Sequence, residues 1–249
     1  MHHHVQTWRF ESPKAGETPA NSEDRSVIYQ RHAASPIAIA ISNGATASFR
    51  SGRWAELLVQ RYIADPPEAI DQDWLLPVAE LYRKDFELQS LRWNIQEKAG
   101  RGGFATLLGI ELDVLRRRLF CLSVGDSCLY IRTQSSIRVF PSRYEASASF
   151  LQNPYLIASN PSYNQELSAR AKTESYRIPR GQSVLYAVSD CLGRWMSLAL
   201  ERGGTPWHIL DEVSRLGTRA FKEFVRSERA SGDMEDDDVT LIIVRVVVV

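Results

Sequence analysis

Residues 118–133, which read RLFCLSVGDSCLYIRT, decide the fold. Two runs rich in apolar residues, Arg118–Val124 and Cys128–Thr133, flank a short polar segment, Gly125-Asp126-Ser127. Glycine, Asp and Ser are typical turn residues, so this stretch predicts two antiparallel strands joined by a tight turn. Similar runs on either side extend the pattern to a predicted antiparallel meander, with further strands at Phe104–Leu112 and Ile137–Phe140.

Helical and extended patterns alternate in blocks outside this meander. Strands are predicted at Ser26–Gln30, Ile37–Ile41, Ser183–Ser189 and Val239–Val249. Helices are predicted from Ser51, which can cap the first one, and at Asp73–Lys98, Leu192–Leu200 and Pro206–Arg226. Residues Leu151–Ala171 are rich in Asn, Pro and Ser and predict an irregular segment. This order predicts an α+β fold with two antiparallel β-sheets sandwiched between pairs of α-helices.

The length of 249 residues and the 44% hydrophobic content favour one large domain. We assign residues 21–249 to that domain and residues 1–20 to an N-terminal tail and loop. The adjacent His2, His3 and His4 are interpreted as a disordered tail and not as a metal site.

The balanced charge composition disfavours binding partners that carry a strong charge of one sign. Lys and Arg together number 30, as do Asp and Glu, so no net field attracts nucleic acid or an anionic membrane. No apolar run reaches the ~18 residues of a membrane span. The three cysteines, Cys121, Cys128 and Cys191, lack metal-ligand spacing and suit a reducing compartment. We therefore expect a cytoplasmic protein that binds neither nucleic acid nor membrane.

Four short polar segments lie beside predicted strands, where metal ligands are commonly placed. They are Glu23-Asp24, Ser42-Asn43-Gly44, Ser189-Asp190 and Asp236-Asp237-Asp238. Carboxylate and carbonyl oxygens from several chain segments are the ligands that hard divalent cations prefer. Taken singly, each segment is more often a helix cap or a solvated loop. Only their combination in one site would indicate metal chemistry.

Taken in order, with Gly125-Asp126-Ser127 between them, these segments resemble the protein phosphatase type 2C family of metal-dependent serine/threonine phosphatases. The resemblance spans about Asn21 to Val247. Asn21–Arg25 is similar to the family's Asn-x-Glu-Asp segment, Ile39–Gly44 to its Asp-Gly turn, Val188–Asp190 to its Ser-Asp-Gly turn, and Asp237–Leu241 to its Asp-Asn-Val-Thr strand. The Gly-Ala-Thr sequence after Asn43 resembles a bacterial branch of the family.

The resemblance implies a binuclear Mg²⁺ or Mn²⁺ centre whose bridging water attacks phosphoserine or phosphothreonine in a phosphoprotein substrate. It also implies which residues form the site. The metal ligands would be Glu23, Asp24, Asn43, Gly44, Asp126, Asp190 and Asp237, of which Asn43, Asp190 and Asp237 are assigned as catalytic. Asp126 matches a position that helps to bind an additional, weaker cation.

The chain departs from the family at several of these positions. Asn43 stands where the family has its bridging Asp, and Ala45 stands where many members have a His. Cys191 replaces a Gly, Arg194 stands where some members have an Asp, and Pro19 lies near the position of the phosphate-binding Arg. Arg25 or Lys14 would have to replace that last residue. A neutral side chain between two cations forfeits several kcal/mol, since unit charges 4 Å apart interact by ~4 kcal/mol at an effective dielectric of 20.

Three hypotheses therefore stay open. The chain is a metal-dependent phosphatase weakened by Asn43, a catalytically inactive phosphatase-like module that binds phosphoproteins or another regulatory partner, or an unrelated α+β domain with coincidental acidic turns.

Overall fold

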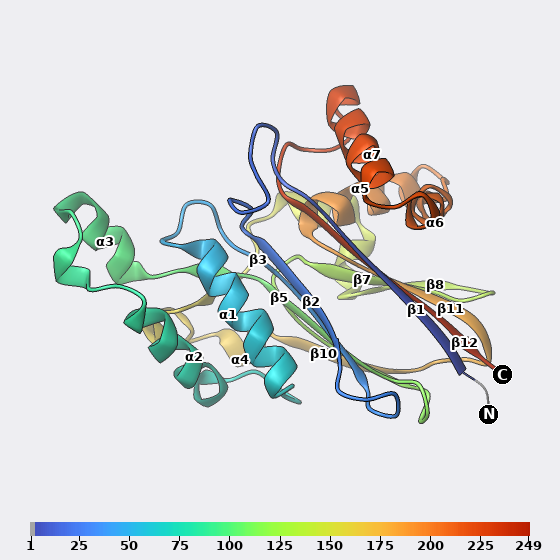
Figure 1. Cartoon of the computed structure of the whole chain (residues 1–249), viewed down its shortest axis with the longest axis horizontal. Helices are drawn as coiled ribbons and strands as arrows, with labels where there is room; N and C mark the ends of the chain where they lie inside the picture. Colours follow the sequence, from blue (N-terminus) through green and yellow to red (C-terminus); the bar gives the residue numbers. More distant parts are fainter. Residues whose placement is uncertain (1–2) are drawn as a thin grey trace.

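Two antiparallel sheets are stacked face to face in the computed structural model, which describes residues 3–249 (Figure 1). The first sheet contains, in spatial order, β1 (His3–Ser12), β12 (Val239–Val248), β11 (Gly181–Val188), β7 (Cys128–Arg132) and β8 (Ile137–Phe140). The second contains β10 (Lys172–Arg177), β6 (Arg118–Val124), β5 (Leu107–Asp113), β3 (Ile37–Asn43) and β2 (Asp24–Gln30). A separate pair is formed by β4 (Phe104–Ala105) and β9 (Ile157–Ala158).

Helices cover the outer face of each sheet, so the predicted α+β arrangement of two sheets between helices is confirmed (Figure 1). The second sheet is covered by α1 (Ser51–Ala64), α2 (Gln72–Lys84) and α3 (Trp93–Arg101). The first is covered by α5 (Asp190–Glu201), α6 (Pro206–Leu216) and α7 (Thr218–Ser231). Short elements complete the chain: α4 (Leu167–Arg170) and the 3₁₀ turns Leu88–Ser90, Ser142–Glu145, Ser147–Leu151 and Pro161–Tyr163.

Side chains of β3 alternate between the two faces of its sheet, so this strand contributes to two hydrophobic cores. Its isoleucines, Ile37, Ile39 and Ile41, pack between the sheets. Ala40 faces the helices instead, opposite Gly109 of β5. Small residues are needed on that face because a Cβ on Gly109 would lie 2.1 Å from the Tyr62 ring of α1. The tight packing fixes α1 over the strand end that carries Asn43.

The N-terminal tail predicted for residues 1–20 is wrong for residues 3–12. They form β1, an edge strand paired with β12 from His3 opposite Val248 to Ser12 opposite Val239. Backbone pairing stabilises this strand, although only Phe10 and Ser12 of its side chains are buried, so hydrophobic alternation could not reveal it. His3 and His4 belong to it, whereas Met1 and His2 lie outside the described residues. That residues 21–249 form a single domain stays a prediction.

Two predicted helices are each divided in the structure. The 73–98 pattern is broken after Lys84, where Arg53 and Arg50 bind Asp85 and Phe86 packs edge-on against Phe49. The 206–226 pattern is broken at Gly217, whose φ of 87° ends α6. The segment expected to be irregular, residues 151–171, contains only short elements: β9, one 3₁₀ turn and α4.

The Gly125-Asp126-Ser127 turn also has a different place from the one predicted. It does not close a hairpin, because β6 lies in the second sheet and β7 in the first. The turn instead carries the chain from one sheet to the other, and Gly125 has a φ of 104°. Asp126 is therefore placed between the two sheets at one end of the sandwich. The edge strand β10, with mostly exposed side chains, was not predicted at all.

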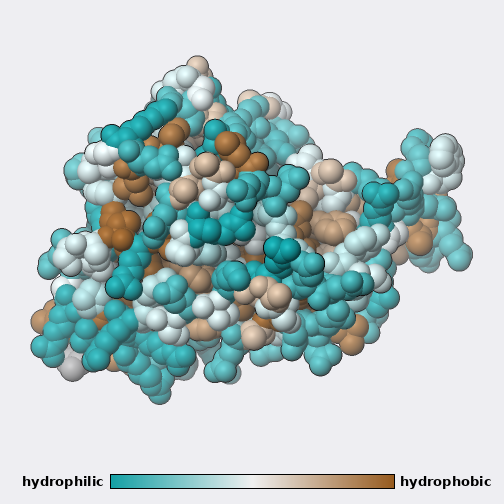
Figure 2. All heavy atoms as spheres, turned by 180° about the vertical axis from the view of Figure 1, so that it is seen from behind, coloured by the Kyte–Doolittle hydropathy of each residue, from teal (hydrophilic) through white to brown (hydrophobic). Residues whose placement is uncertain are grey.

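The surface seen from behind is largely hydrophilic, with apolar residues scattered over it (Figure 2). The segment that carries α3 projects from the rest of the molecule (Figure 1). No helix within residues 3–249 has the length and apolar character needed to cross a membrane.

Candidate metal centre

The predicted site residues lie where strands of both sheets begin or end. Asn43 is the last residue of β3 and is paired with Asp24, the first residue of β2. Asp190 opens α5 directly after β11, and Asp237 lies just before β12. Contacts between Asn43 and Asp190 and between Glu23 and Asp238 bring these four chain segments together at one end of the sandwich. That they form one metal site stays a prediction.

Asn43 is oriented as a hydrogen-bond donor toward Asp190. Its side-chain Nδ2 lies 3.0 Å from Asp190 Oδ1. Its backbone N–H donates to Thr106 Oγ1 over 3.0 Å, which fixes the strand end. The residue therefore supplies an amide proton to this carboxylate where the family's Asp would supply a negative charge.

Glu23 faces an internal cation, the ammonium group of Lys14. Lys14 Nζ lies 3.3 Å from Glu23 Oε2 and 3.1 Å from Asp237 Oδ1. Thr46 Oγ1 donates to Glu23 Oε2, and Ser51 Oγ donates to Glu23 Oε1. Ser51 thus binds Glu23 and does not cap α1 as predicted, since the N-cap position is held by Arg50 without a side-chain hydrogen bond.

Lys14 remains charged in this setting. Burial lowers the pKa of its ammonium group, but hydrogen bonds and charges from Asp237 and Glu23 outweigh burial, so the pKa lies above its ordinary value. Arg25, the other basic residue considered for phosphate binding, donates to the backbone oxygens of Ser22 and Asp24. Of the two, only Lys14 reaches the carboxylates.

Gly44 allows the chain to pass closely beneath α1. A Cβ at this position would lie 2.7 Å from the backbone carbon of Ser51. Its N–H donates to the backbone oxygen of Glu23 over 3.2 Å. The glycine therefore holds the Glu23 and Asn43 segments side by side.

Asp24 lies deeper than the other acidic residues and is only 4% exposed. Its Oδ2 accepts a hydrogen bond from Thr240 Oγ1 at 2.8 Å. Its Oδ1 is buried and has no hydrogen-bond partner among the described residues. Burial, followed by the charge of Asp190, raises the pKa of Asp24 above its ordinary value.

The pKa values of Asp126 and Asp190 are also raised by their surroundings. Burial, followed by the charge of Asp237, raises the pKa of Asp190 to about 6, although hydrogen bonds from the Cys191 N–H and from Asn43 act in the opposite direction. Burial, followed by the charge of Asp190, raises the pKa of Asp126 to about 7. Each carboxylate disfavours ionisation of the next, and a bound cation would relieve that cost.

Asp238 organises the site, a role that the sequence reasoning missed. Its Oδ2 accepts the backbone N–H of Glu23 at 2.6 Å, and its Oδ1 accepts the backbone N–H of Lys14 at 3.0 Å. Arg229 of α7 was missed as well. It donates to the backbone oxygens of Pro13 and Asp237. The only signal for Asp238 was its position, where the family has Asn.

The acidic side chains are not gathered into a larger metal-binding group. Within residues 3–249 no group of three or more His, Cys, Asp or Glu side chains is arranged to hold a metal. Asp190 and Asp237 lie close enough for the charge of Asp237 to raise the pKa of Asp190. A pair of carboxylates is compatible with Mg²⁺, which is commonly held by one or two carboxylates and keeps several waters.

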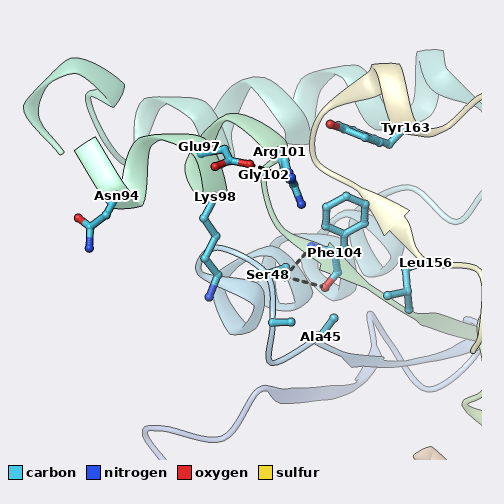
Figure 3. A pocket seen from close by; sticks show the side chains of 11 residues that line it. Ala45, Ser48, Asn94, Glu97, Lys98, Arg101, Gly102, Phe104, Leu156 and Tyr163 are labelled. Carbon is cyan, nitrogen blue, oxygen red and sulfur yellow. Dashed lines mark hydrogen bonds and ion pairs between the residues drawn. The ribbon is translucent and has the colours of Figure 1, made fainter. Parts of the chain in front are cut away.

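A cavity of about 760 Å³ is lined on one side by Ala45 and Ser48, which follow Asn43 and Gly44 in the chain, but by none of the predicted site residues (Figure 3). Lys98 and Arg101 contribute from α3, and the Lys98 side chain extends toward the loop that carries Ala45. Phe104 and Tyr163 supply an aromatic wall, with their ring centroids 5.6 Å apart. The cavity therefore combines basic and aromatic groups.

Solved structures share this architecture over nearly the whole chain. The phosphatase domain of the cell fate determinant SpoIIE from Bacillus subtilis has 17% sequence identity and a TM-score of 0.52, and the alignment covers 98% of this chain and 93% of that one. A second SpoIIE structure, which contains the PP2C phosphatase domain and a fragment of the regulatory domain, has a TM-score of 0.56. This chain has the type 2C phosphatase fold.

Two further type 2C phosphatase-fold neighbours support the same conclusion. RsbX in complex with magnesium has 15% identity and a TM-score of 0.55, covering 98% of this chain and 96% of its own. The S. agalactiae serine/threonine phosphatase has 15% identity and a TM-score of 0.54, covering 99% and 100%. No family model and no curated protein matches the sequence itself.

Proposed function

We propose that the chain is a metal-dependent protein serine/threonine phosphatase whose hydrolysis is weakened by Asn43. One observation carries this proposal. Asn43 contacts Asp190, and one ammonium group contacts both Glu23 and Asp237. The charge of Asp237 also acts on Asp190, so these residues are neighbours at one end of the sandwich. They lie in a fold shared with bacterial serine/threonine phosphatases.

The proposed cofactor is Mg²⁺ or Mn²⁺, held by Asp190 and Asp237 together with neutral oxygens. When bound, such a cation would supply Lewis-acid polarisation of the phosphoryl group and would lower the pKa of a water molecule. The role of nucleophile is left to water, because all three cysteines are buried. Burial also raises the pKa of each thiol above its ordinary value.

The cavity beside Ala45 supplies groups that can hold a phosphoprotein. Lys98 is available to acidic or phosphorylated flanking residues, whereas Arg101 is paired with Glu97 over 2.8 Å. Phe104 and Tyr163 offer an aromatic wall to apolar residues. We therefore propose a phosphoprotein as substrate and the cytoplasm as the location.

A second candidate function is favoured by the same two unusual groups. Asn43 presents an amide proton to Asp190, and Lys14 forms ion pairs with Glu23 and Asp237 without a metal. Both features suit a module that binds phosphoproteins without hydrolysing them.

Hydrolysis of a phenyl phosphate ester and of a phosphothreonine peptide, measured with and without Mn²⁺, separates the two candidates. The phosphatase proposal predicts Mn²⁺-dependent turnover that is lost in Asp190→Ala. Peptide binding without turnover, at every Mn²⁺ concentration, would refute hydrolysis and leave the binding module. Turnover that survives Asp190→Ala would show that the chemistry lies elsewhere.

A further inference from the structure

The Lys14 ammonium group is bound as completely as a coordinated ion. Its nitrogen lies 3.3 Å from Glu23 Oε2, 3.1 Å from Asp237 Oδ1 and 2.9 Å from Thr46 Oγ1. Of the three N–H donors of an ammonium group, two form hydrogen bonds with Glu23 and Thr46, and Asp237 lies within ion-pair distance. Its side chain is only 21% exposed, which limits competition from water.

The backbone around Lys14 is held just as firmly. Its own N–H donates to Asp238 Oδ1 over 3.0 Å, and the N–H of Ala15 donates to Asp236 Oδ1 over 2.9 Å. On the other side, Arg229 donates to the backbone oxygen of Pro13 over 3.0 Å. The loop after β1 is thus fixed by residues that precede β12, so the position of the ammonium group does not depend on a flexible side chain alone.

Lys14 places a positive charge directly between two of the site's carboxylates. Its ammonium group contacts Glu23 and Asp237. A divalent cation bound between the same two carboxylates would lie close to that ammonium group, and like charges at such short range repel strongly.

We propose that the Lys14 ammonium group takes the place of one of two cations, between Glu23 and Asp237, so that the site binds one divalent cation fewer than its carboxylates would otherwise hold. Asp237 contacts Lys14 through Oδ1, so its Oδ2 would be the oxygen that holds a cation together with Asp190. The inference rests on the proposed function, since it assumes that these carboxylates form a metal site.

Calorimetric titration with MnCl₂ tests this proposal through stoichiometry and not through activity. Lys14→Met should bind one Mn²⁺ more per chain than the wild type. Lys14→Arg, which keeps the charge, should retain the wild-type stoichiometry. Lys84→Met, which removes an exposed lysine at the end of α2, is the matched control and should also be unchanged.

An unchanged stoichiometry in Lys14→Met would overturn the proposal, as would an equal gain in Lys84→Met. Thermal unfolding verifies that each variant is folded, and Lys14→Ser is the second variant if Lys14→Met does not fold. The two levels of inference fail separately. A gain of one Mn²⁺ in Lys14→Met, together with no turnover by the wild type, would refute the phosphatase function and still support the role of Lys14.

Discussion

Asn43→Asp restores the family's carboxylate and should make the stability of the protein depend on metal. Without a cation, the 3.0 Å hydrogen bond between Asn43 Nδ2 and Asp190 Oδ1 is replaced by two carboxylates at the same distance. The lost hydrogen bond to a charged group is worth about 1.5–3 kcal/mol. Repulsion at 3 Å and an effective dielectric of 20 would add roughly 5 kcal/mol if both groups stayed ionised.

Protonation limits this cost. Because burial and the charge of Asp237 already raise the pKa of Asp190 to about 6, protonating it at pH 7 costs only on the order of 1 kcal/mol. The free energy of unfolding of the metal-free variant should therefore fall by about 3 kcal/mol in total. For a chain of this length, each kcal/mol shifts the melting temperature by about 2–4 °C, so we expect a decrease of about 6–12 °C.

Divalent metal should reverse this loss. The new carboxylate faces the cation, so Mn²⁺ should bind at least about tenfold more tightly to the variant than to the wild type, which is 1.4 kcal/mol. Hydrolysis of a phenyl phosphate ester should rise by at least roughly tenfold. Differential scanning calorimetry with increasing MnCl₂ measures the stability change, because a ligand that binds only the folded state raises the melting temperature.

Asn94→Asp provides the matched control, since it makes the same chemical change at an exposed position of α3 that lines the cavity. It should change the melting temperature little with or without metal. An Asn43→Asp variant as stable as the wild type without metal would refute the contact with Asp190. A variant that loses stability but gains no Mn²⁺ affinity would refute the metal site.

Three further variants test other parts of the site. Asp190→Ala and Asp237→Ala should abolish Mn²⁺ binding in calorimetry, whereas Asp126→Ala should weaken it less; equal losses would contradict this ranking. Asp126→Asn should stabilise the metal-free protein at pH 8. The folded-state pKa of Asp126 is about 7, above its ordinary value of about 3.9. The stability that its protonated form contributes is therefore fully present below pH ~4 and is lost as the pH rises through 7, by up to roughly 4 kcal/mol. Melting curves from pH 4 to 8 measure this, and identical pH dependence in the variant and the wild type would exclude it. Gly44→Ala should lower stability by about 1–3 kcal/mol, because its Cβ would lie 2.7 Å from the backbone of Ser51; an unchanged melting temperature would contradict that crowding.

The sequence predicted the buried strands well because their side chains alternate between two apolar layers. Ile37, Ile39 and Ile41 enter the core between the sheets, and this period of two is visible without a structure. The edge strand β1 was missed because its stability comes from backbone pairing with β12, which leaves little trace in side-chain hydrophobicity. The order of predicted elements therefore indicated the fold class, but not the full extent of the sheets.

The candidate site was only partly readable for a similar reason. Segments such as Ser189-Asp190 and Asn43-Gly44 are local, and their match to a known family pointed to one cleft. The contacts of Lys14 with Glu23 and Asp237 depend instead on how the loop after β1 meets the segment before β12. Residues more than 200 positions apart in the sequence come together there, and no local pattern records such a contact.

Anomalous diffraction from crystals soaked in MnCl₂ would test the central claim most directly, namely that the carboxylates at this end of the sandwich form a metal site in which Lys14 and Asn43 limit cation binding. The account predicts one Mn²⁺ peak, bound by Asp190 and Asp237, with Lys14 Nζ still between Glu23 and Asp237. Two peaks with Lys14 displaced from these carboxylates, or no peak at Asp190 and Asp237, would contradict it.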